Sequence, residues 1–536
     1  MAENKENKVA KENLMSLDEM PEKKGEYDVN IGSDENHSSH HHHNHRKHHS
    51  QKKRKVMKTI GWIASMIQLL LSLFLMFFLY QSAFLPNKYL VGILFGLIVL
   101  FILPRLLMKH YHHKGRFYTG LALAIVLSIL FGVIGYYYQG IVNTAKGITG
   151  ATSETTVYGV YVLKEDPAKE LKDAKEYTFG ILKSLDRSNT DKAIDKVNKQ
   201  LSSSVKTEEF EDMLTQADAL SNKEVGAILL NEAYISAIEE TEGYSDYSKS
   251  IREIAKIDIQ TKTTRAKAEV AKKNNTDCFT VFISGIDVAG PISTTSRSDV
   301  NILATINPKT HQILLVSTPR DYYVATSVSN GAKDKLTHAG IYGINCSMDT
   351  LSALYDTDVD YYFRINFTGF KDVISALGSV TVHSDYAFKA GGYSYVEGEN
   401  TLNADQALAF ARERHAFAEG DRQRGKDQMY VIQGVMNKLS TPAVLNNYSE
   451  LLKGLEGSFQ TSVPYEQLSA MVNEQLSSGT GWSIQQYSVN GSGKSDYTYS
   501  MPRTRLYVME PDMTTVEQAK TYIQQIKNNE IVTVQN

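Results

Sequence analysis

Three long apolar runs in the first quarter of the chain restrict what it can fold into more than any other feature. The first run, Ile60–Phe84, contains no charged residue, and two more follow at Leu90–Leu103 and Phe117–Tyr138. A bilayer core of about 30 Å needs roughly 20 apolar residues per helix, so the runs predict three transmembrane helices within residues 59–140. The first run is too long, and the charged leader before it too extended, for a cleaved signal peptide. The sequence therefore predicts a membrane protein.

Lysine and arginine residues gather on one side of the predicted spans. They precede the first span or flank the loop between the second and third: Lys52, Lys53, Arg54, Lys55, Lys58, Arg105, Lys109, Lys114 and Arg116. The turn between the first and second spans has Lys88. Because positively charged flanks stay in the cytoplasm, we expect a cytoplasmic N-terminus in the plasma membrane and an extracellular chain after about Gly140.

Residues 1–58 form a polar leader that includes the run HSSHHHHNHRKHH, from His37 to His49. Its apolar content is too low for a packed core, so we expect a disordered cytoplasmic tail whose basic end meets anionic lipid. A histidine cluster can also bind divalent transition metals, although this run has no fixed geometry for ligation. The tail is therefore not counted among the predicted metal sites.

Residues 141–270 predict a small α+β domain, which we expect to be an extracellular accessory domain. Stretches typical of strands (TTVYGVYVL and YTFGILKSL) mix with stretches that we interpret as helical (DKAIDKVNKQL, EEFEDMLTQADAL and EVGAILLNEAYISAIEE). The sequence of this part contains no paired carboxylates, metal-ligand spacing or glycine-rich loop. It is therefore interpreted as a spacer or a partner-binding module.

Residues 271–536 predict a larger domain of the α/β class. The apolar run CFTVFISGID is followed by DVNILATINPKTHQILLVSTPRD, which reads as two alternating strands joined through the turn NPKT. Helix-like and strand-like stretches then alternate (CSMDTLSALYD, YYFRINF, GFKDVISAL and SVTVHS), and late strands are expected near Ser483–Val489 and Arg505–Met509. This order indicates a three-layer α/β/α sandwich around a mixed sheet.

Composition removes some functional classes. The formal net charge is −3, and the part predicted to face the cytoplasm has neither a helix-turn-helix nor a zinc-ligand pattern, so nucleic acid is not an expected partner. The two cysteines, Cys278 and Cys346, exclude a disulfide framework and a cysteine-rich metal site. They form either one disulfide or two separate thiols, and we favour the second.

Charged residues stand at the ends of three neighbouring predicted strands. Asp287 closes the first strand of the larger domain, Arg297 and Asp299 precede the second, and Arg320 and Asp321 follow the third. Folds of the α/β class place their sites at strand ends. One Arg-Asp pair is usually a local salt bridge, but three such groups at neighbouring strand ends also predict a functional site.

The stretch ARERHAFAEGDRQRGKDQ gathers basic residues around one Gly-Asp pair. On the helix expected to start near Asp421, positions i, i+3 and i+7 share a face, so Asp421, Arg424 and Gln428 point the same way. Arg422 and Lys426 lie on another face, and we assign them to solvent. An acid in the first turn also suits the helix dipole, so Asp421 is either a helix cap or a site residue.

Several stretches of the larger domain together match the pattern of a known family. They are GID, SRSDVNILATINP, LLVSTPRD, KLTHAGIYG, YYFRINFTGF and ARERHAFAEGDRQRGKDQ. In this order and spacing the chain resembles the LytR-CpsA-Psr family of Gram-positive envelope proteins over nearly all of Cys278–Asn536. The three spans and the small preceding domain look like the capsule-associated branch of that family, whose accessory domain has this place.

The resemblance implies a phosphotransferase. Such an enzyme moves a glycan, here a capsular polysaccharide or teichoic-acid-like polymer, from an undecaprenyl-pyrophosphate carrier to peptidoglycan. Capsule-assembly proteins are further candidate partners. Two other functions stay open: a polyprenyl-pyrophosphate hydrolase that passes the phosphoryl group to water, and a non-catalytic regulator of capsule synthesis that binds polyprenyl phosphate.

The resemblance also implies roles for individual residues. Asp287 and Asp299 would hold Mg²⁺ on the pyrophosphate, and Asp421 would be the base for the attacking hydroxyl. The residues implied to grip phosphate oxygens are Arg297, Arg320, Arg412, Arg414, Arg424 and Gln428. Of these, Arg412 and Arg414 are also implied to act in catalysis. Guanidinium groups suit phosphate because their planar fork binds two oxygens, and carboxylates are hard ligands that suit Mg²⁺.

One position departs from the family's pattern. Many relatives have arginine directly before the equivalent of Gln428, and this chain has Asp427 there. The departure puts in doubt whether Lys426 and its neighbours contact phosphate.

A polyprenyl tail would need an apolar slot near the arginines. The candidate positions are Phe363, Phe367, Phe370, Leu351, Leu354, Val431, Val435 and Leu439. Each also has the spacing of an ordinary core residue, so a lined slot and a filled core both remain possible.

Overall fold

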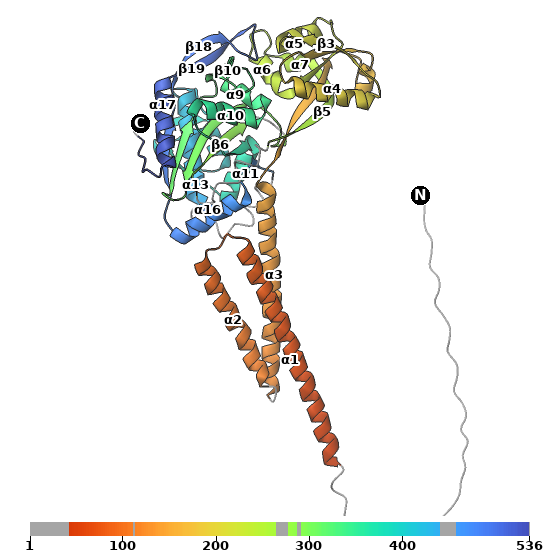
Figure 1. Ribbon diagram of the computed structural model, residues 1–536, viewed down its shortest axis with the longest axis vertical. Coiled ribbons are helices and arrows are strands. Elements are labelled where there is room, and N and C mark those ends of the chain that lie inside the picture. The colour runs from red at the N-terminus through yellow and green to blue at the C-terminus, as the bar shows by residue number, and fades with distance from the viewer. Residues whose placement is uncertain (1–41, 111–112, 264–276, 287–290, 440–456, 535–536) are drawn as a thin grey trace, which may run out of the picture. The chain divides into compact units, whose positions relative to one another are not determined.

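The computed structural model describes residues 42–110, 113–263, 277–286, 291–439 and 457–534. Three long helices are followed by a small α/β domain and then by a larger one (Figure 1). Residues 63–536 form one compact unit, and the contacts described below lie within it.

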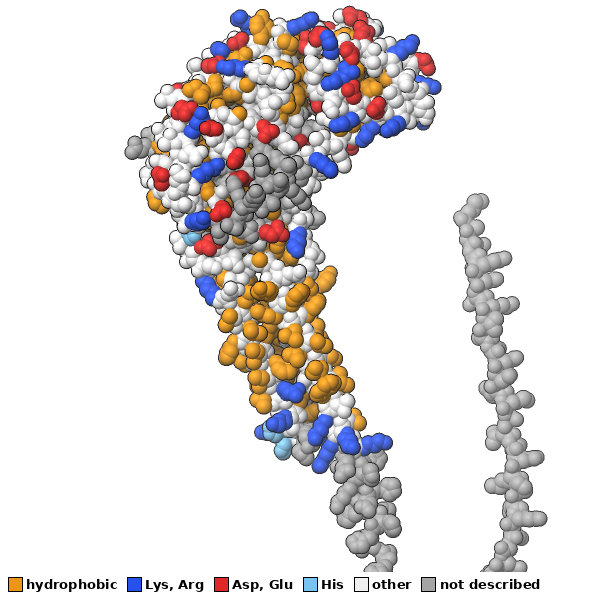
Figure 2. All heavy atoms as spheres, viewed as in Figure 1, with side chains coloured by type: hydrophobic (Ala, Val, Ile, Leu, Met, Phe, Trp, Pro, Cys, Tyr) orange, Lys and Arg blue, Asp and Glu red, His pale blue; other side chains and the backbone are white. Residues whose placement is uncertain are grey.

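Three helices that could cross a membrane occupy the region of the predicted spans: α1 (His42–Gln81), α2 (Asn87–Lys109) and α3 (Lys114–Ile148). Their outward surface is an apolar band, with basic side chains gathered at one end of it (Figure 2). Helices α2 and α3 approach closely at Gly120, where an added Cβ would lie 2.8 Å from the carbonyl oxygen of Pro104. Small residues at such a crossing let helix backbones pack tightly in a membrane. The three helices therefore form a packed bundle with an apolar outside.

The small domain is built on a five-stranded sheet with the order β3-β2-β4-β1-β5. Its strands are β1 (Ser153–Leu163), β2 (Thr178–Leu182), β3 (Lys206–Phe210), β4 (Ala227–Asn231) and β5 (Ile251–Lys262). Its helices are η1 (Leu171–Ala174), α4 (Arg187–Leu201), α5 (Met213–Ser221), η2 (Glu232–Tyr234), α6 (Ile235–Glu239) and α7 (Tyr247–Ser250). Apolar cores lie on both faces of the sheet.

Two stretches of the small domain that we interpreted as helical begin as strands. They are β3, at the start of EEFEDMLTQADAL, and β4, inside EVGAILLNEAYISAIEE. Strand β4 is buried along its whole length, with Ile228 and Leu230 in one core and Leu229 in the other. A short apolar run that is buried on both faces shows no alternation of apolar and polar residues. The helical prediction is wrong at both places. For β4 the reason is that only the sheet arrangement separates such a strand from a buried helix, whereas β3 is an exposed edge strand rich in charged residues.

A six-stranded mixed sheet with the order β16-β11-β6-β7-β8-β17 forms the centre of the larger domain. Its strands are β6 (Phe279–Ile286), β7 (Ser298–Asn307), β8 (Gln312–Ser317), β11 (Tyr361–Asn366), β16 (Phe459–Thr461) and β17 (Ser483–Ser488). Strands β7 and β8 form the predicted antiparallel hairpin, whereas β11 runs parallel to β6 and β17 parallel to β8. The mixed character of the sheet agrees with the sequence-based prediction.

Helices cover both faces of this sheet. One layer holds α9 (Leu336–Ala339), η3 (Gly340–Tyr342), α10 (Ile344–Tyr355) and α17 (Met513–Lys527), and the other holds α13 (Asp421–Leu439) and α16 (Tyr465–Ser478). In β8, Leu314 and Val316 belong to the core under the first layer, and Ile313 and Leu315 to the core under the second. The three-layer α/β/α sandwich is confirmed (Figure 1).

Smaller elements surround the sandwich. They are β9 (Tyr323–Ala325), β10 (Lys333–Lys335), α11 (Phe367–Leu377), β12 (Val380–Ser384), β13 (Phe388–Ala390), β14 (Tyr393–Tyr395), β15 (Gly398–Leu402), α12 (Ala404–Arg412), β18 (Gly491–Tyr497) and β19 (Arg505–Pro511). The predicted strand SVTVHS exists as β12, but it pairs with β15 outside the main sheet. It belongs to a separate apolar core with α11, α12 and α13.

The two extracellularly predicted domains share an apolar core. Ile238 of α6 packs in the same cluster as Ile341 and Met501 of the larger domain. A guanidinium nitrogen of Arg364 in β11 also pairs at 2.8 Å with Glu154 of β1, and both side chains are almost fully buried. These contacts hold the small domain against the larger one.

Helix α16 connects the larger domain to the helix bundle. The hydroxyl of Tyr465 donates to the backbone oxygen of Ser82 at 2.7 Å, and its ring meets Phe84 edge to face. The ammonium group of Lys88 donates to the backbone oxygen of Ser477 at 2.8 Å. The turn between α1 and α2 and the larger domain therefore lie at the same end of the bundle.

Candidate functional site

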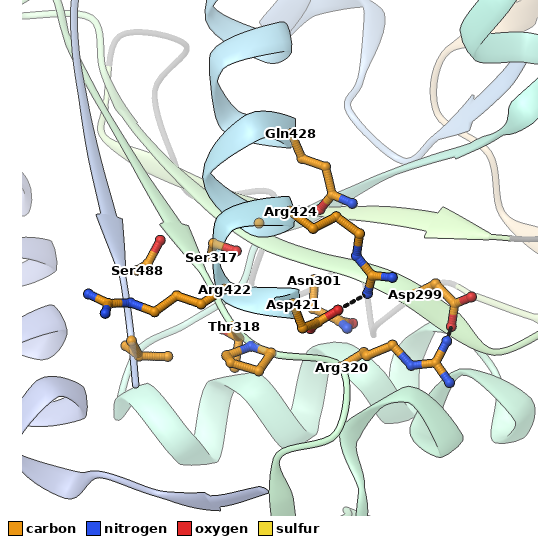
Figure 3. A pocket seen from close by; sticks show the side chains of 13 residues that line it. Asp299, Asn301, Ser317, Thr318, Arg320, Asp421, Arg422, Arg424, Gln428 and Ser488 are labelled. Carbon is orange, nitrogen blue, oxygen red and sulfur yellow. Dashed lines mark hydrogen bonds and ion pairs between the residues drawn. The ribbon is translucent and has the colours of Figure 1, made fainter. Parts of the chain in front are cut away.

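A polar pocket lies at the ends of β7 and β8, beside the first turns of α13 (Figure 3). Its lining includes Asp299, Asn301, Arg320, Asp421, Arg424 and Gln428. The fold thus brings together Asp299 and Arg320, predicted at strand ends, and the arginine-rich stretch that lies about a hundred residues later in the chain.

Glycine residues allow α13 to begin at this place. An added Cβ at Gly425 would lie 2.6 Å from the hydroxyl oxygen of Ser317, at the end of β8. Gly420 has φ +54, a left-handed conformation that glycine adopts without strain. The first residue of α13 is Asp421, directly after that glycine. The first turn of the helix is therefore pressed against the strand ends, where Asp421 and Arg424 face the pocket.

Arg320 lies between two carboxylates at the pocket wall. One terminal nitrogen is 2.8 Å from an oxygen of Asp299, and the other is 2.9 Å from an oxygen of Glu240. The hydroxyl of Thr337 donates to the same Asp299 oxygen at 3.1 Å. Burial tends to lower the pKa of Arg320, but Asp299, Asp321 and Glu240 raise it above its ordinary value. The guanidinium stays charged and is held in one orientation.

Glu240 of the small domain was missed by sequence reasoning. It pairs with Arg297, and its second oxygen is 3.1 Å from the ammonium group of Lys335. Burial alone would raise the pKa of Glu240, but Lys335, Arg297, His338 and Arg320 together lower it to about 2. Its stretch IEETEG has no motif that would mark it. Lys335 stands in the quoted stretch KLTHAGIYG, where the sequence offered a weak signal.

Asp421 forms an ion pair with Arg424, one helical turn further on (Figure 3). Burial raises the pKa of Asp421; Arg424 acts against this effect, and the nearby carboxylate of Asp321 adds to it. The pKa remains above its ordinary value. A carboxylate with a raised pKa accepts a proton more readily, which is what a general base needs.

The remaining predicted residues lie at different distances from this centre. Gln428 lines the pocket and donates from its amide to the backbone oxygen of Ala411 at 3.2 Å, at the end of α12. The guanidinium carbon of Arg412 is 4.2 Å from the centroid of the Phe367 ring. Arg412 and Arg414 are exposed and outside the pocket lining found among the described residues. The charge of Arg414 nevertheless lowers the pKa of Asp421, so that side chain is close to the site.

Arg422 lines the pocket, which contradicts its assignment to solvent. It extends on the side of Ser488, away from Arg320 (Figure 3). The pocket curves around the first turn of α13, so side chains on two faces of that turn border it. The i, i+3, i+7 rule considers a single face and misses this arrangement.

Most of the charges around the pocket are already paired. Ion pairs connect four cations with four carboxylates, and these eight formal charges cancel: Arg297, Arg320, Lys335 and Arg424 with Glu240, Asp299, Asp321 and Asp421. Arg422 in the lining and the nearby Arg414 add positive charge. A multiply charged anion that enters such a site gains little unless a cation accompanies it or an acid is neutralised.

The residues present are compatible with Mg²⁺. One Asp299 oxygen already accepts hydrogen bonds from Arg320 and Thr337, which fixes the carboxylate for ligation through its other oxygen. Mg²⁺ usually takes one or two carboxylates plus substrate phosphates rather than a cage of protein ligands. The described residues contain no group of three or more His, Cys, Asp or Glu that could form such a cage. The other predicted ligand, Asp287, lies outside the described residues.

Asp427, the position that departs from the family, is fully buried. One of its oxygens accepts a hydrogen bond from Gln423 at 2.9 Å, and the same amide donates to Asp385 at 3.1 Å. Burial raises the pKa of Asp427 to about 7. Lys426 lies 3.8 Å from a carboxylate oxygen of Asp385. These residues form a polar cluster within the fold, and neither Asp427 nor Lys426 lines the pocket among the described residues.

Asp427→Asn is expected to raise the melting temperature at pH 8 and to leave it almost unchanged near pH 4. The folded-state pKa of about 7 lies above the ordinary value of 3.8, so the carboxyl contributes stability below the ordinary pKa. That contribution is lost as the pH rises through the folded-state pKa, and asparagine avoids the loss. Thermal unfolding of the full chain in detergent at pH 4, 6 and 8 measures the effect.

The matched control for this prediction is Asp195→Asn, at an exposed position. Its melting temperature should equal that of wild type at each of the three pH values. An equal change in melting temperature at all three pH values for Asp427→Asn would contradict an ionisation effect.

Most candidate lipid-slot residues fill apolar cores. Leu351 and Val431 are fully buried, in two different clusters. Phe370 and Val435 pack against the second of these clusters. Leu439 at the end of α13 is exposed. Within the described residues, packing accounts for the buried positions better than a lined slot does, and Leu439 lies in neither cluster. The two cysteines are not joined by a disulfide, as favoured from the sequence.

The fold and the site define a class of protein: a membrane-helix-bearing α/β protein with a guanidinium and carboxylate pocket suited to phosphate-type anions. Residues 241–518, more than half of the 536 residues, match the model of the LytR_cpsA_psr family. The chain belongs to the LytR_cpsA_psr family, which confirms the resemblance seen in its motifs.

Two relatives and one solved structure illustrate the similarity. Polyisoprenyl-teichoic acid–peptidoglycan teichoic acid transferase TagU of Bacillus subtilis (strain 168) is 32% identical over 256 residues, covering 47% of this chain and 82% of that protein. The protein of the same name from Enterococcus faecalis (strain ATCC 700802 / V583) is 32% identical over 207 residues, covering 38% and 68%. The crystal structure of B. subtilis TagU shares 29% sequence identity with a TM-score of 0.38, covering 48% of this chain and 100% of that one.

Proposed function

We propose that this chain transfers a glycan polymer from a polyprenyl-pyrophosphate carrier to a hydroxyl group of peptidoglycan. The observation that carries the proposal is the pocket in which Asp421 lies with Arg320 and Arg424 at the ends of β7 and β8. Guanidinium groups bind phosphate oxygens and stay charged, and a carboxylate beside them can accept a proton. The names of the two transferase relatives support the same reaction.

In the proposed step, the acceptor hydroxyl oxygen forms a bond to the phosphorus that carries the glycan. The bond from that phosphorus to the bridging oxygen breaks, and polyprenyl monophosphate leaves with the electron pair. The hydroxyl proton moves to Asp421, and the product is a phosphodiester between glycan and peptidoglycan. Negative charge on the equatorial and leaving oxygens is stabilised by Arg320 and Arg424, since phosphoryl transfer depends mainly on positioning and electrostatics.

The other arginines complete the grip on the carrier. Gln428 lines the pocket with Arg424, and Arg297 joins the site through the shared carboxylate of Glu240. Arg412 and Arg414 are exposed at the end of α12. We assign these two to the outer phosphate and glycan oxygens, because solvent-exposed guanidinium groups can follow an incoming anion.

We also propose that Mg²⁺ accompanies the pyrophosphate, with Asp299 and Asp287 as its protein ligands. When bound, the ion would neutralise negative charge on the phosphate oxygens. The ion pairs of the pocket support this assignment, since Arg297, Arg320 and Arg424 are already paired with carboxylates. Asp299 then has two tasks, holding Arg320 and binding the ion.

The proposed carrier is undecaprenyl-pyrophosphate, and the proposed polymer is a capsular polysaccharide or a teichoic-acid-like glycan. The combination of three membrane helices with a small domain before the larger one supports the capsule-associated branch. The names of the relatives support the teichoic-acid side. Capsule-assembly proteins are proposed as partners because the same arrangement of helices and domains supports the capsule-associated branch.

A turnover assay with the full chain in proteoliposomes tests the proposal. Lipid-linked glycan and peptidoglycan fragments are supplied with Mg²⁺, and the expected product is glycan covalently joined to peptidoglycan. Chelation of the metal should abolish the product. Release of phosphorylated glycan into water without joining would favour the hydrolase, and tight carrier binding without any turnover would favour the regulator.

A cysteine placed at Ser495 is expected to react with a membrane-impermeant thiol reagent on intact, wall-permeable cells, and one placed at Ser33 is not. Ser495 is exposed on β18 of the larger domain, which we propose lies outside the cell. The background carries Cys278→Ala and Cys346→Ala, so the native thiols do not contribute. Labelling at Ser33 alone would put the site in the cytoplasm and separate it from peptidoglycan.

A further inference from the structure

Glu240 brings a carboxylate from the small domain into the anion site of the larger one. It directly follows α6, one residue before the segment that matches the family. Its side chain is about one quarter exposed and contacts Arg297, Arg320 and Lys335. One side chain therefore connects three cations that come from three different segments of the larger domain.

The position of Glu240 is held by packing on both sides. Ala237 and Ile238, on the turn just before it, are fully buried in the core that contains Ile341 of the larger domain. Gly340, next to Ile341, packs against the backbone of the segment that carries Arg297. An added Cβ at Gly340 would lie 2.5 Å from the carbonyl oxygen of Ser296. That carbonyl directly precedes the residue Arg297. The same close-packed junction between the two domains therefore fixes the positions of Glu240 and Arg297.

The contacts of Arg320 show what Glu240 does. Its two terminal nitrogens are held by different acids, Asp299 on one and Glu240 on the other. Two hydrogen-bonded anchors in the guanidinium plane fix the rotation of the group. Asp321 lies 3.7 Å from the Nε atom, too far for a hydrogen bond, so without Glu240 only Asp299 would hold the group by hydrogen bonding. Glu240 also lies between positive charges of Arg297 and Lys335 that would otherwise repel Arg320. Its low pKa keeps it ionised at any physiological pH.

We propose that Glu240 is a positioning residue of the phosphate site, through which the small domain orients Arg297 and Arg320 for the pyrophosphate. The inference rests on the proposed function and gives the small domain a direct part in it. A carboxylate that acts through the arginines improves binding of the phosphate groups without touching the reacting atoms.

The opposite role would be an internal occupant that competes with phosphate for the same arginines. Two observations favour positioning. Among the described residues that line the pocket are Arg320 and Arg424 but not Glu240, which contacts Arg320 from outside the lining. The shared core around Ile238 also keeps Glu240 in place, whereas an occupant must leave when substrate enters.

Binding of farnesyl pyrophosphate with Mg²⁺ to the full chain in detergent tests the proposal. Glu240→Gln keeps the size of the side chain and removes the charge, and Glu240→Asp keeps the charge but withdraws it by one methylene. For Glu240→Gln we expect the Kd for farnesyl pyrophosphate to rise about 10-fold to 100-fold, by analogy with partners that orient metal ligands. The KM for the lipid-linked glycan in the transfer assay should rise by a similar factor. The turnover number kcat for glycan transfer should change much less. The Kd of Glu240→Asp should lie between the values of Glu240→Gln and wild type.

The exposed Glu242→Gln is the matched control, two residues away on the same segment, and should bind as wild type does. A double-mutant cycle with Arg297→Gln adds a readout that a purely structural role would not move. If Glu240 acts through Arg297, the combined loss in binding is smaller than the sum of the single losses.

Unchanged or tighter binding by Glu240→Gln would overturn the proposal, and tighter binding would identify an internal competitor. A lower melting temperature with unchanged Kd would likewise assign Glu240 to the domain junction alone. Failure of the proposed function itself looks different, because wild type would then not bind the pyrophosphate probe with or without Mg²⁺.

Discussion

Asp421→Asn is expected to lower glycan transfer by about 10²-fold to 10⁴-fold while the carrier lipid stays bound at least as tightly as in wild type. Asparagine cannot accept the proton of the attacking hydroxyl, so the chemical step loses its base. The substitution also removes a negative charge from an anion site, where Asp421 is paired with Arg424. Single-turnover transfer and equilibrium binding of the same lipid, both with the full chain, measure the two effects separately.

The fold is expected to tolerate this substitution. Asp421 is the first residue of α13 and follows Gly420, so asparagine keeps the size of the side chain and loses only a favourable charge near the helix N-terminus, worth about 0.3–1 kcal/mol. A melting temperature close to that of wild type is the control for this point. Transfer that survives nearly unchanged in Asp421→Asn would reduce Asp421 to a helix-terminal residue and leave the reaction without its proposed base.

Arg320→Lys is expected to lower transfer by about 10²-fold or more and to weaken carrier binding, although it keeps the positive charge. The guanidinium of Arg320 reaches Asp299 with one nitrogen and Glu240 with the other, at 2.8 Å and 2.9 Å. A lysine ammonium is a single point and cannot hold both acids while presenting further donors to phosphate. Binding and transfer assays on the purified full chain measure the loss.

Arg187→Lys provides the matched control, since Arg187 makes ion pairs with Asp191 and Glu209 on the surface of the small domain. This control should behave as wild type in both assays. Equal activity of Arg320→Lys and wild type would show that charge alone matters at this position, and the geometric argument for Arg320 would fail.

Part of the site was predictable because local rules govern it. Asp421, Arg424 and Gln428 share a helix face, and all three line the pocket. Asp299 and Arg320 follow from the hairpin, because β7 and β8 pair antiparallel and bring the start of one strand beside the end of the other. Helical periodicity and hairpin pairing act over a few residues, so the residues themselves carry the information.

Other parts of the site were not predictable, because they depend on contacts between segments that are far apart in the sequence. Glu240 joins Arg297 and Arg320 across a junction between two domains, and no nearby pattern marks it. Arg422 faces the pocket because β17 ends beside the first turn of α13, a neighbour that helix periodicity does not include. Arg412 stacks on Phe367 at the surface instead of entering the pocket lining of the described residues.

The sequence by itself determined the three membrane-length helices, the hairpin joined by NPKT and the family, because hydropathy, turn chemistry and motif spacing are properties of the chain itself. The tertiary structure decided that Ala227–Asn231 is a buried central strand and that SVTVHS leaves the main sheet. It also decided that a carboxylate of the small domain pairs with three cations beside the pocket. Burial on two faces, strand pairing and ion pairing between distant segments depend on which parts of the chain become neighbours, and that is settled only by the folded structure.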